Sequence, residues 1–203
     1  MTGRTSHGRE TGGGDTRSAR PLLIDGWLDA AACARVCRAM DAGTPEIAEI
    51  LDATIAPDET VRRSSHIDVD LETFAWLDGV LDASRAPVQQ HFAMTPAGRE
   101  GISLLRYQPG DYFKPHRDWG VVPSWPDAAR RRISLVLFLR TSRDADPAGT
   151  FSGGALRLFD DNGDEVRDIH PRAGTLVAFP STTLHEVTPI RDGIRDVIVD
   201  WFY

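Results

Sequence analysis

From Gly101 onward the sequence consists of short runs rich in β-branched, aromatic and other apolar residues, and this pattern constrains the fold more than any other feature. Gly, Pro, Asp and Asn separate the runs. Strands at such a spacing are typical of a sandwich or barrel rather than of alternating strand–helix units. We therefore expect strands at residues 102–107, 111–116, 132–140, 154–159, 174–180, 184–189 and 195–203.

The residues before Gly101 show mainly helical patterns. Asp29 is expected to cap a helix that ends at Gly43, and Asp70 to cap a second helix. Pro87 interrupts the second pattern and is expected to begin a further helical turn. Short strands are expected near 22–24 and at 61–69.

These patterns predict one domain at residues 21–203. In it, residues 21–100 provide helical support and residues 101–203 form the β-rich core. Residues 1–20 are rich in Gly, Thr, Ser and Arg and have no large apolar residue after Met1. Such a segment cannot offset the entropy lost on ordering, so we expect a disordered tail.

Charge and composition restrict the partners that the chain is expected to have. A net charge of -7 and a pI near 5.3 argue against nucleic-acid and anionic-membrane binding. There is no apolar run of bilayer length and no signal-peptide segment. Cys33 and Cys37, the only cysteines, lie four positions apart on one helix face and are expected to be reduced and buried. We expect a cytoplasmic protein, with monomer and homodimer both left open.

His116 and Asp118 form the first candidate metal motif, His-x-Asp. At strand periodicity both side chains project from one face, and His185 follows on a different strand. Two histidines and one carboxylate leave three coordination positions open, which suits non-haem iron(II). A bare His-x-Asp is common by chance, so a surface hydrogen-bonded pair is one alternative. A catalytic zinc site of a hydrolase is the other.

Arg195 adds a second component to this candidate site. It follows His185 by ten positions, across a turn region that includes Pro189 and Gly193. A hairpin of this length would bring the guanidinium beside His185. Arginine pairs with a carboxylate through two parallel hydrogen bonds, so it suits the far end of a dicarboxylate co-substrate.

Several motifs in this order resemble the iron(II)/2-oxoglutarate dioxygenases, in particular the prolyl-4-hydroxylase-like branch. The resemblance covers about half of the chain, from roughly Gly101 to Tyr203. The residues that carry it are Tyr107-x-x-Gly110 before His116-x-Asp118, Gly153-Gly154-x-Leu156-x-x-Phe159, Pro171-x-x-Gly174-x-Leu176-x-x-Phe179, His185-Glu186-Val187-x-Pro189, Arg195 and Trp201.

The resemblance implies a mainly β fold with flanking helices, built on a double-stranded β-helix (jelly-roll) core. It implies iron(II) on the three residues named above, and the distal carboxylate of 2-oxoglutarate on Arg195 with Tyr107. Leu156 and Trp201 are expected to line the pocket. Phe138 and Val199 stand where some relatives place hydroxyl groups, so Ser134 or water is expected to compensate.

The implied activity is a dioxygenase reaction that consumes O2 and 2-oxoglutarate, hydroxylates an unactivated C–H bond, and releases succinate and CO2. Ascorbate is a possible reductant. The presence of Asp118 favours hydroxylation over the halogenation of related enzymes that leave this coordination position open. The zinc-dependent hydrolase remains the more distant alternative.

The substrate is expected to be an amino acid or an amino-acid-derived small molecule, and a peptidyl or protein prolyl hydroxylase is the alternative. Arg62, Lys114 and Trp119 are the candidate substrate-binding residues. Lys114 shares the sequence parity of the two metal-motif residues on its strand. The run Arg130-Arg131-Arg132 is expected to face solvent, as consecutive arginines usually do.

Overall fold

The computed structural model describes residues 20–47, 60–121 and 125–203. Apart from exposed Arg20, the tail expected at residues 1–20 lies outside these ranges. Among the described residues, no helix combines the length and the apolar character needed to cross a bilayer.

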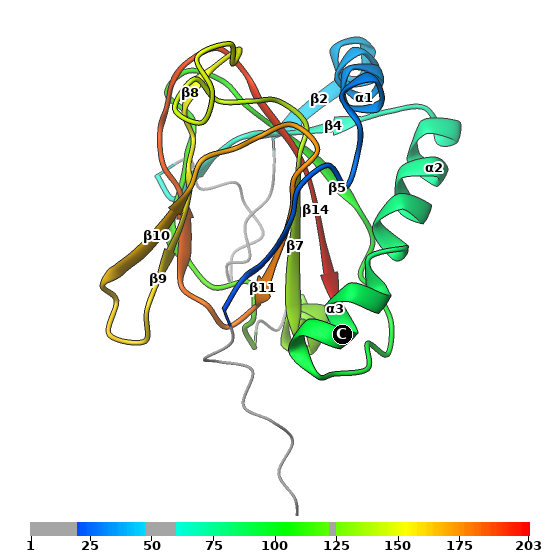
Figure 1. The fold of residues 1–203 in the computed structure, drawn as a ribbon, viewed down its shortest axis with the longest axis vertical. Helices are drawn as coiled ribbons and strands as arrows, with labels where there is room; N and C mark the ends of the chain where they lie inside the picture. Colours follow the sequence, from blue (N-terminus) through cyan, green and yellow to red (C-terminus); the bar gives the residue numbers. More distant parts are fainter. Residues whose placement is uncertain (1–19, 48–59, 122–124) are drawn as a thin grey trace, which may run out of the picture.

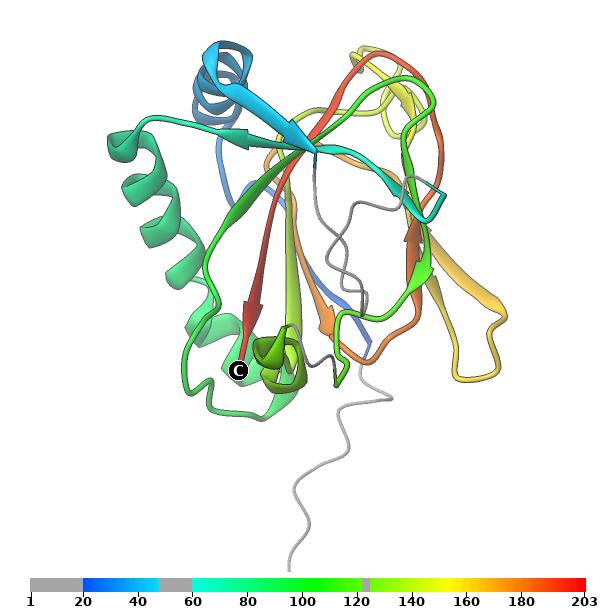
Figure 2. The ribbon, with the colours of Figure 1, turned by 180° about the vertical axis from the view of Figure 1, so that it is seen from behind.

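Two antiparallel sheets face each other and form the body of the molecule (Figures 1 and 2). The larger sheet has the order β1 (Leu22–Ile24), β11 (Leu176–Pro180), β7 (Ile133–Phe138), β14 (Arg195–Phe202), β5 (Ser103–Tyr107), β4 (Ser65–Asp68) and β2 (Thr44–Ile47). The smaller sheet has the order β10 (Glu165–Ile169), β9 (Leu156–Phe159), β12 (His185–Val187), β6 (Tyr112–His116) and β3 (Arg62–Arg63). A separate pair joins β13 (Ile190–Asp192) to β8 (Ser152–Gly153).

Three helices pack against the outer face of the larger sheet, away from the smaller sheet (Figure 1). They are α1 (Ala30–Ala42), α2 (Leu71–Asp82) and α3 (Arg85–Phe92). Asp29 and Asp70 cap the first two helices as expected, because each carboxylate accepts a hydrogen bond from a backbone N–H of the first turn. The short 3₁₀ helix η2 (Pro126–Arg130) lies before β7.

The two cysteines of α1 are unpaired and buried, as the sequence predicts. Burial raises the pKa of both thiols, Cys33 and Cys37, to about 11. The Cys37 thiol donates to the carbonyl oxygen of Leu139, at 3.6 Å. Both side chains therefore act as small apolar residues that pack helix α1 against the larger sheet.

The central strand β7 is buried along its whole length because it separates two cores. Leu135 and Leu137 belong to the core beneath the helices, whereas Val136 and Phe138 belong to the core between the sheets. β14 lies next to β7 and alternates in the same way, so one of its faces looks into the space between the sheets.

Each strand expected after residue 101 has a counterpart, with ends displaced by a few residues. β2, β8, β10 and β13 were not expected. β2 and β10 are edge strands with polar sequences, Thr44–Ile47 and Glu165–Ile169, and β8 and β13 form only the two-stranded pair. Edge strands bury little and therefore lack the apolar alternation by which strands are recognised.

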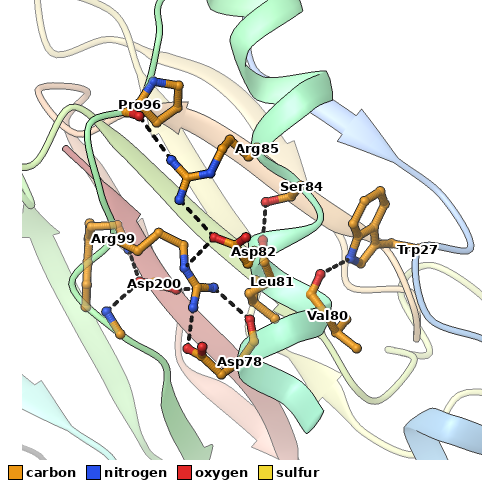
Figure 3. A network of polar contacts seen from close by, with 12 residues as sticks. Trp27, Asp78, Val80, Leu81, Asp82, Ser84, Arg85, Pro96, Arg99 and Asp200 are labelled. Atoms are coloured by element: carbon orange, nitrogen blue, oxygen red, sulfur yellow. Dashed lines mark hydrogen bonds and ion pairs between the residues drawn. The ribbon is translucent and has the colours of Figure 1, made fainter. Parts of the chain in front are cut away.

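An ionic network centred on the buried Arg99–Asp200 pair joins α2 to β14 and to the segment before β5 (Figure 3). The Arg99 guanidinium contacts the carboxylates of Asp78, Asp82 and fully buried Asp200. Arg85 donates to Asp82 and to the carbonyl oxygen of Pro96. These contacts fix the approach of residues 96–101 to the larger sheet.

We expect Gly174→Ala to destabilise the fold more than Gly26→Ala. Both glycines have positive φ, +81° and +67°, so each alanine pays a backbone cost of roughly 1–2 kcal/mol. At Gly174 the added Cβ would also lie 2.0 Å from the carbonyl oxygen of Leu28, whereas at Gly26 it meets nothing within 4 Å. Urea unfolding of the two variants measures the difference. Equal losses of stability would contradict the close contact between Gly174, before β11, and Leu28, before α1.

Candidate metal centre and its pocket

The pairing of β6 with β12 brings three potential metal ligands together. His116 ends β6 and lies opposite His185, the first residue of β12. Asp118 lies just beyond β6, with its two carboxylate oxygens each 3.6 Å from the Nε2 atom of one histidine. The potential ligand atoms of these three side chains all lie within 4.8 Å of one another. Among the described residues, no other group of three or more His, Cys, Asp or Glu side chains meets this condition.

Both imidazole rings are oriented by their own backbone. Nδ1 of His116 lies 2.8 Å from the carbonyl oxygen of Lys114, and Nδ1 of His185 lies 2.9 Å from that of Thr183. A carbonyl oxygen only accepts, so Nδ1 carries the proton in each ring and the lone pair of Nε2 faces the cluster. Phe113 stacks on His116, with ring centroids 3.4 Å apart, and restricts the rotation of that ring.

The charge state of the cluster suits a divalent metal. Burial, followed by the nearby His185, lowers the pKa of His116 below its usual range, which keeps its imidazole neutral. Burial alone would raise the pKa of Asp118, but the two histidines and the Ser134 hydroxyl outweigh this effect and lower it. The Ser134 hydroxyl donates to Oδ2 of Asp118 at 2.6 Å. A neutral imidazole at His116 and an ionised carboxylate at Asp118 are the forms in which these side chains bind a metal.

A cavity of about 800 Å³ opens over this cluster, between the two sheets. β14 contributes one wall with every second residue: Arg195, Val197, Val199 and Trp201. The expected residues Tyr107, Leu156 and Arg62 also line the cavity, whereas Lys114, Trp119 and Ser134 do not.

Arg195 is the most completely buried charge of this cavity, at 2% exposure. Its Nε donates to the carbonyl oxygen of Gly154 at 2.9 Å, and its guanidinium lies near the rings of Tyr107 and Phe138. A Cβ on Gly154 would lie 2.8 Å from Cδ of Arg195, so the absence of a side chain there makes room for the arginine. The Nη1 atom is buried and has no hydrogen-bond partner among the described residues.

The structure corrects the prediction for Lys114. His185 of β12 pairs with His116 of β6, and Val187 pairs with Phe113. Two positions along β12 therefore correspond to three positions along β6, which is a β-bulge. This bulge reverses the alternation of side chains. Phe113 therefore lines the cavity, and Lys114 is exposed on the other side of the strand.

Trp119 and Ser134 also differ from their expected roles. Trp119 is 42% exposed, and its indole N–H donates to the carbonyl oxygen of Ala129 on η2. Ser134 is buried behind Asp118, where it also contacts the hydroxyl of Ser181 at 3.0 Å. It therefore supports a metal ligand and does not replace a hydroxyl group near Arg195.

The expected hairpin between His185 and Arg195 is wrong, although both residues reach the same cavity. β12 pairs with β6 and β9 in the smaller sheet, and β14 pairs with β5 and β7 in the larger one. The connection passes through β13 and crosses from one sheet to the other. Arg195 thus faces the cluster across the cavity.

Sequence reasoning missed a buried polar group in the cavity wall. Arg131, expected to face solvent, is 3% exposed and forms a two-point ion pair with Glu100. Trp125 contacts the same carboxylate through its indole N–H, at 3.3 Å. The run of three consecutive arginines does not indicate which side chain is buried. The partner of Arg131, Glu100, lies 31 positions earlier in the sequence, so no local pattern reveals the pair.

A family model described as the 2OG-Fe(II) oxygenase superfamily matches residues 102–203, half of the chain. The chain belongs to this superfamily. The expected double-stranded β-helix fold is therefore confirmed, and so is the expected likeness to the prolyl-4-hydroxylase branch.

Curated relatives and solved structures agree with this assignment. A PKHD-type hydroxylase of Shewanella sp. (strain ANA-3) is 36% identical over 96 residues, which cover 47% of this chain and 39% of the relative. A PKHD-type hydroxylase of Klebsiella pneumoniae (strain 342) is 33% identical over 144 residues, 70% of this chain and 60% of the relative. The chain thus matches less than two thirds of the length of these relatives.

A prolyl-4-hydroxylase from Pseudomonas putida has 27% identity and a TM-score of 0.68, over 91% of this chain and 92% of that one. A prolyl hydroxylase from Trichoplax adhaerens, solved with a hypoxia inducible factor peptide fragment, has 18% identity and a TM-score of 0.72, over 92% and 84% of the two chains. At this identity the second likeness concerns the fold alone.

We expect His185→Ala to abolish metal binding, with Mn(II) as an air-stable probe. Mn(II) at about 100 times its Kd should add roughly 2.7 kcal/mol to the stability of the unchanged protein, because only the folded state assembles the ligands. Thermal melts with and without Mn(II) measure this gain. The control His170→Ala removes an exposed histidine and should keep it. A full Mn(II)-induced shift in His185→Ala would contradict the assigned ligand set.

Ser134→Ala should weaken Mn(II) binding by about 10- to 100-fold, the usual effect of removing a hydrogen bond to a metal ligand. Ser181→Ala is the matched control, because Ser181 contacts the Ser134 hydroxyl, whereas it is Ser134 that donates to the Asp118 carboxylate. Its effect should be several-fold smaller. Anaerobic titration calorimetry measures both affinities. Unchanged Mn(II) affinity in Ser134→Ala would show that Asp118 needs no such support.

Proposed function

We propose that this protein is an iron(II)- and 2-oxoglutarate-dependent dioxygenase that hydroxylates an unactivated C–H bond and releases succinate and CO2. One observation carries the proposal: the buried guanidinium of Arg195, whose Nη1 has no hydrogen-bond partner among the described residues, shares a cavity with the cluster of His116, Asp118 and His185. A metal site alone fits several chemistries. A metal site with a separate buried anion receptor fits a chelating dicarboxylate.

The surroundings of Arg195 support a carboxylate ligand at this point. Burial lowers the pKa of its guanidinium to about 10, so it remains charged at neutral pH. The neighbouring Asp196 points to the opposite side of β14, where it is bound to Arg106 and Arg140. No described acidic side chain forms an ion pair with Arg195, and an incoming carboxylate would offset the cost of burying this charge.

When bound together with O2, iron(II) and 2-oxoglutarate supply the oxidant for the C–H bond. The chain's own residues hold and shield this site. His116, Asp118 and His185 would hold the metal, and Arg195 with Tyr107 would hold the distal carboxylate. Apolar side chains from both sheets, including Leu156, Val187 and Val197, would exclude water from the reacting centre.

The substrate we propose is an amino acid or an amino-acid-derived molecule. The cavity end furthest along β14 from Arg195 carries Trp201, whose buried indole N–H has no partner among the described residues. An oxygen acceptor of the substrate would satisfy this donor. Arg62 and Glu46 line the same cavity and offer charges of both signs, as an amino-acid substrate with both an amine and a carboxylate requires.

A peptidyl prolyl hydroxylase is the second candidate. It is favoured by the cavity volume of about 800 Å³, which exceeds the needs of one amino acid beside 2-oxoglutarate, and by the solved prolyl hydroxylases of similar fold. Free amino acids and short prolyl peptides, tested side by side for stimulation of succinate release, separate the two candidates. Stimulation of succinate release by peptides alone would favour the peptidyl prolyl hydroxylase over the amino-acid hydroxylase.

We expect the Fe(II)-loaded protein to convert 2-oxoglutarate to succinate under air, and Arg195→Met to raise the KM for 2-oxoglutarate by at least about 30-fold. This factor corresponds to the roughly 2 kcal/mol or more lost when one partner of a buried charge pair is removed. Arg191→Met is the control, because Arg191 is exposed and bound to Asp144. The KM of Arg191→Met for 2-oxoglutarate should equal that of the unchanged protein.

Succinate release is followed by chromatography at varied 2-oxoglutarate. Iron-loaded protein that never turns over 2-oxoglutarate, alone or with any substrate of the panel, would overturn the dioxygenase proposal. An unchanged KM in Arg195→Met would overturn only the assignment of the carboxylate to Arg195.

A further inference from the structure

Asp118 lies outside the β-ladder that positions the two histidines. β6 ends at His116, and the last paired residue of the strand is His116 itself, opposite His185. The backbone of Asp118 is therefore not held by sheet hydrogen bonds. Contacts from other segments must fix the position of its carboxylate, because a metal site tolerates only small displacements of its ligands.

Arg131 supplies such a contact from the segment between η2 and β7. Its Nη1 donates to the backbone carbonyl oxygen of Asp118 at 3.3 Å, in a fully buried position. Its other donors, Nε and Nη2, are occupied by the two oxygens of Glu100, with 2.6 Å for the Nε contact. A guanidinium held by a bidentate carboxylate has little freedom to rotate, so it presents Nη1 to Asp118 in one orientation.

The face of the same guanidinium is covered by the indole ring of Trp201, 3.7 Å from its central carbon. Trp125 also contacts Glu100 and lies 5.8 Å from the guanidinium. Glu100, Arg131, Trp125 and Trp201 all line the cavity, together with Asp118. One buried arginine thus joins the aromatic wall of the cavity to the main chain of Asp118.

We propose that Arg131, fixed by Glu100, is a positioning residue that holds the backbone of Asp118 and so sets the affinity of the metal site. The inference rests on the metal site of the proposed function. It assigns to Arg131 no contact with the metal, with 2-oxoglutarate or with the reacting atoms. The ion pair acts through geometry, because a rigid donor fixes the main chain from which the carboxylate extends.

Arg99 offers a matched control, because it is the neighbour of Glu100 and forms a similar ion network on the other side of the larger sheet (Figure 3). Its side chain is 8% exposed, against 3% for Arg131, and its partner Asp200 is the neighbour of Trp201. The carboxylates that Arg99 contacts are those of Asp78, Asp82 and Asp200, and Asp118 is not among them. Loss of either arginine removes a buried ion pair, but only loss of Arg131 removes the contact with Asp118.

The experiment measures anaerobic Mn(II) affinity and the urea unfolding of the metal-free protein in Arg131→Met, Arg131→Lys and Arg99→Met. We expect Arg131→Met to weaken Mn(II) binding by about 10- to 100-fold and to alter the Mn(II) electron paramagnetic resonance spectrum. Arg131→Lys should fall between Arg131→Met and the unchanged protein, because a lysine provides one charged donor without the fork. Arg99→Met should lower stability while its Mn(II) affinity stays within about twofold.

Unchanged Mn(II) affinity and spectrum in Arg131→Met would overturn the proposal, as would an equal loss of affinity in Arg99→Met. If Arg131→Met does not fold, the Mn(II) affinity of Arg131→Lys tests the proposal instead. A Mn(II) affinity of Arg131→Lys equal to that of the unchanged protein would then overturn the proposal. A failure of the unchanged protein to bind Mn(II) would instead contradict the proposed function, so the two failures are distinct.

Discussion

The antiparallel pairing of β6 with β12 is the interaction on which the rest of the site depends. It places His185 opposite His116, and the bulge in the same pairing turns Phe113 onto the His116 ring. The backbone carbonyls two residues before each histidine then fix the ring orientations. A slip of one residue in this register would send one imidazole to the outer face. Strand pairing therefore fixes the positions and orientations of both imidazoles without any bound ligand.

Much of this arrangement could be predicted from the sequence, because it follows from local patterns. The caps at Asp29 and Asp70 and the β-rich run after Gly101 depend on neighbouring residues, and the structure places these elements where they are expected. The side of a strand on which Lys114 lies could not be predicted, because a bulge reverses the alternation without a sequence signal. The inward turn of Arg131 depends on Glu100, a distant partner that no local pattern reveals.

Three buried arginines show how one side chain serves different purposes. Arg99 is surrounded by carboxylates and joins a helix to a sheet (Figure 3). Arg131 is neutralised by one carboxylate and stacked on an indole ring, so it presents a fixed donor with little net charge. Arg195 is enclosed by aromatic rings and keeps a donor without a partner among the described residues. The three side chains are similarly buried and differ mainly in the number of carboxylates that they contact among the described residues.

Cys33 and Cys37 of helix α1 are both buried and carry free thiols. Because both thiols lie in the helix core and their pKa values are raised to about 11, they are almost entirely protonated at neutral pH and shielded from reagents. The sequence holds no other cysteine. A single cysteine introduced at the cavity rim would therefore be the only reactive thiol, so a fluorophore or spin label could be attached there without removing the native residues.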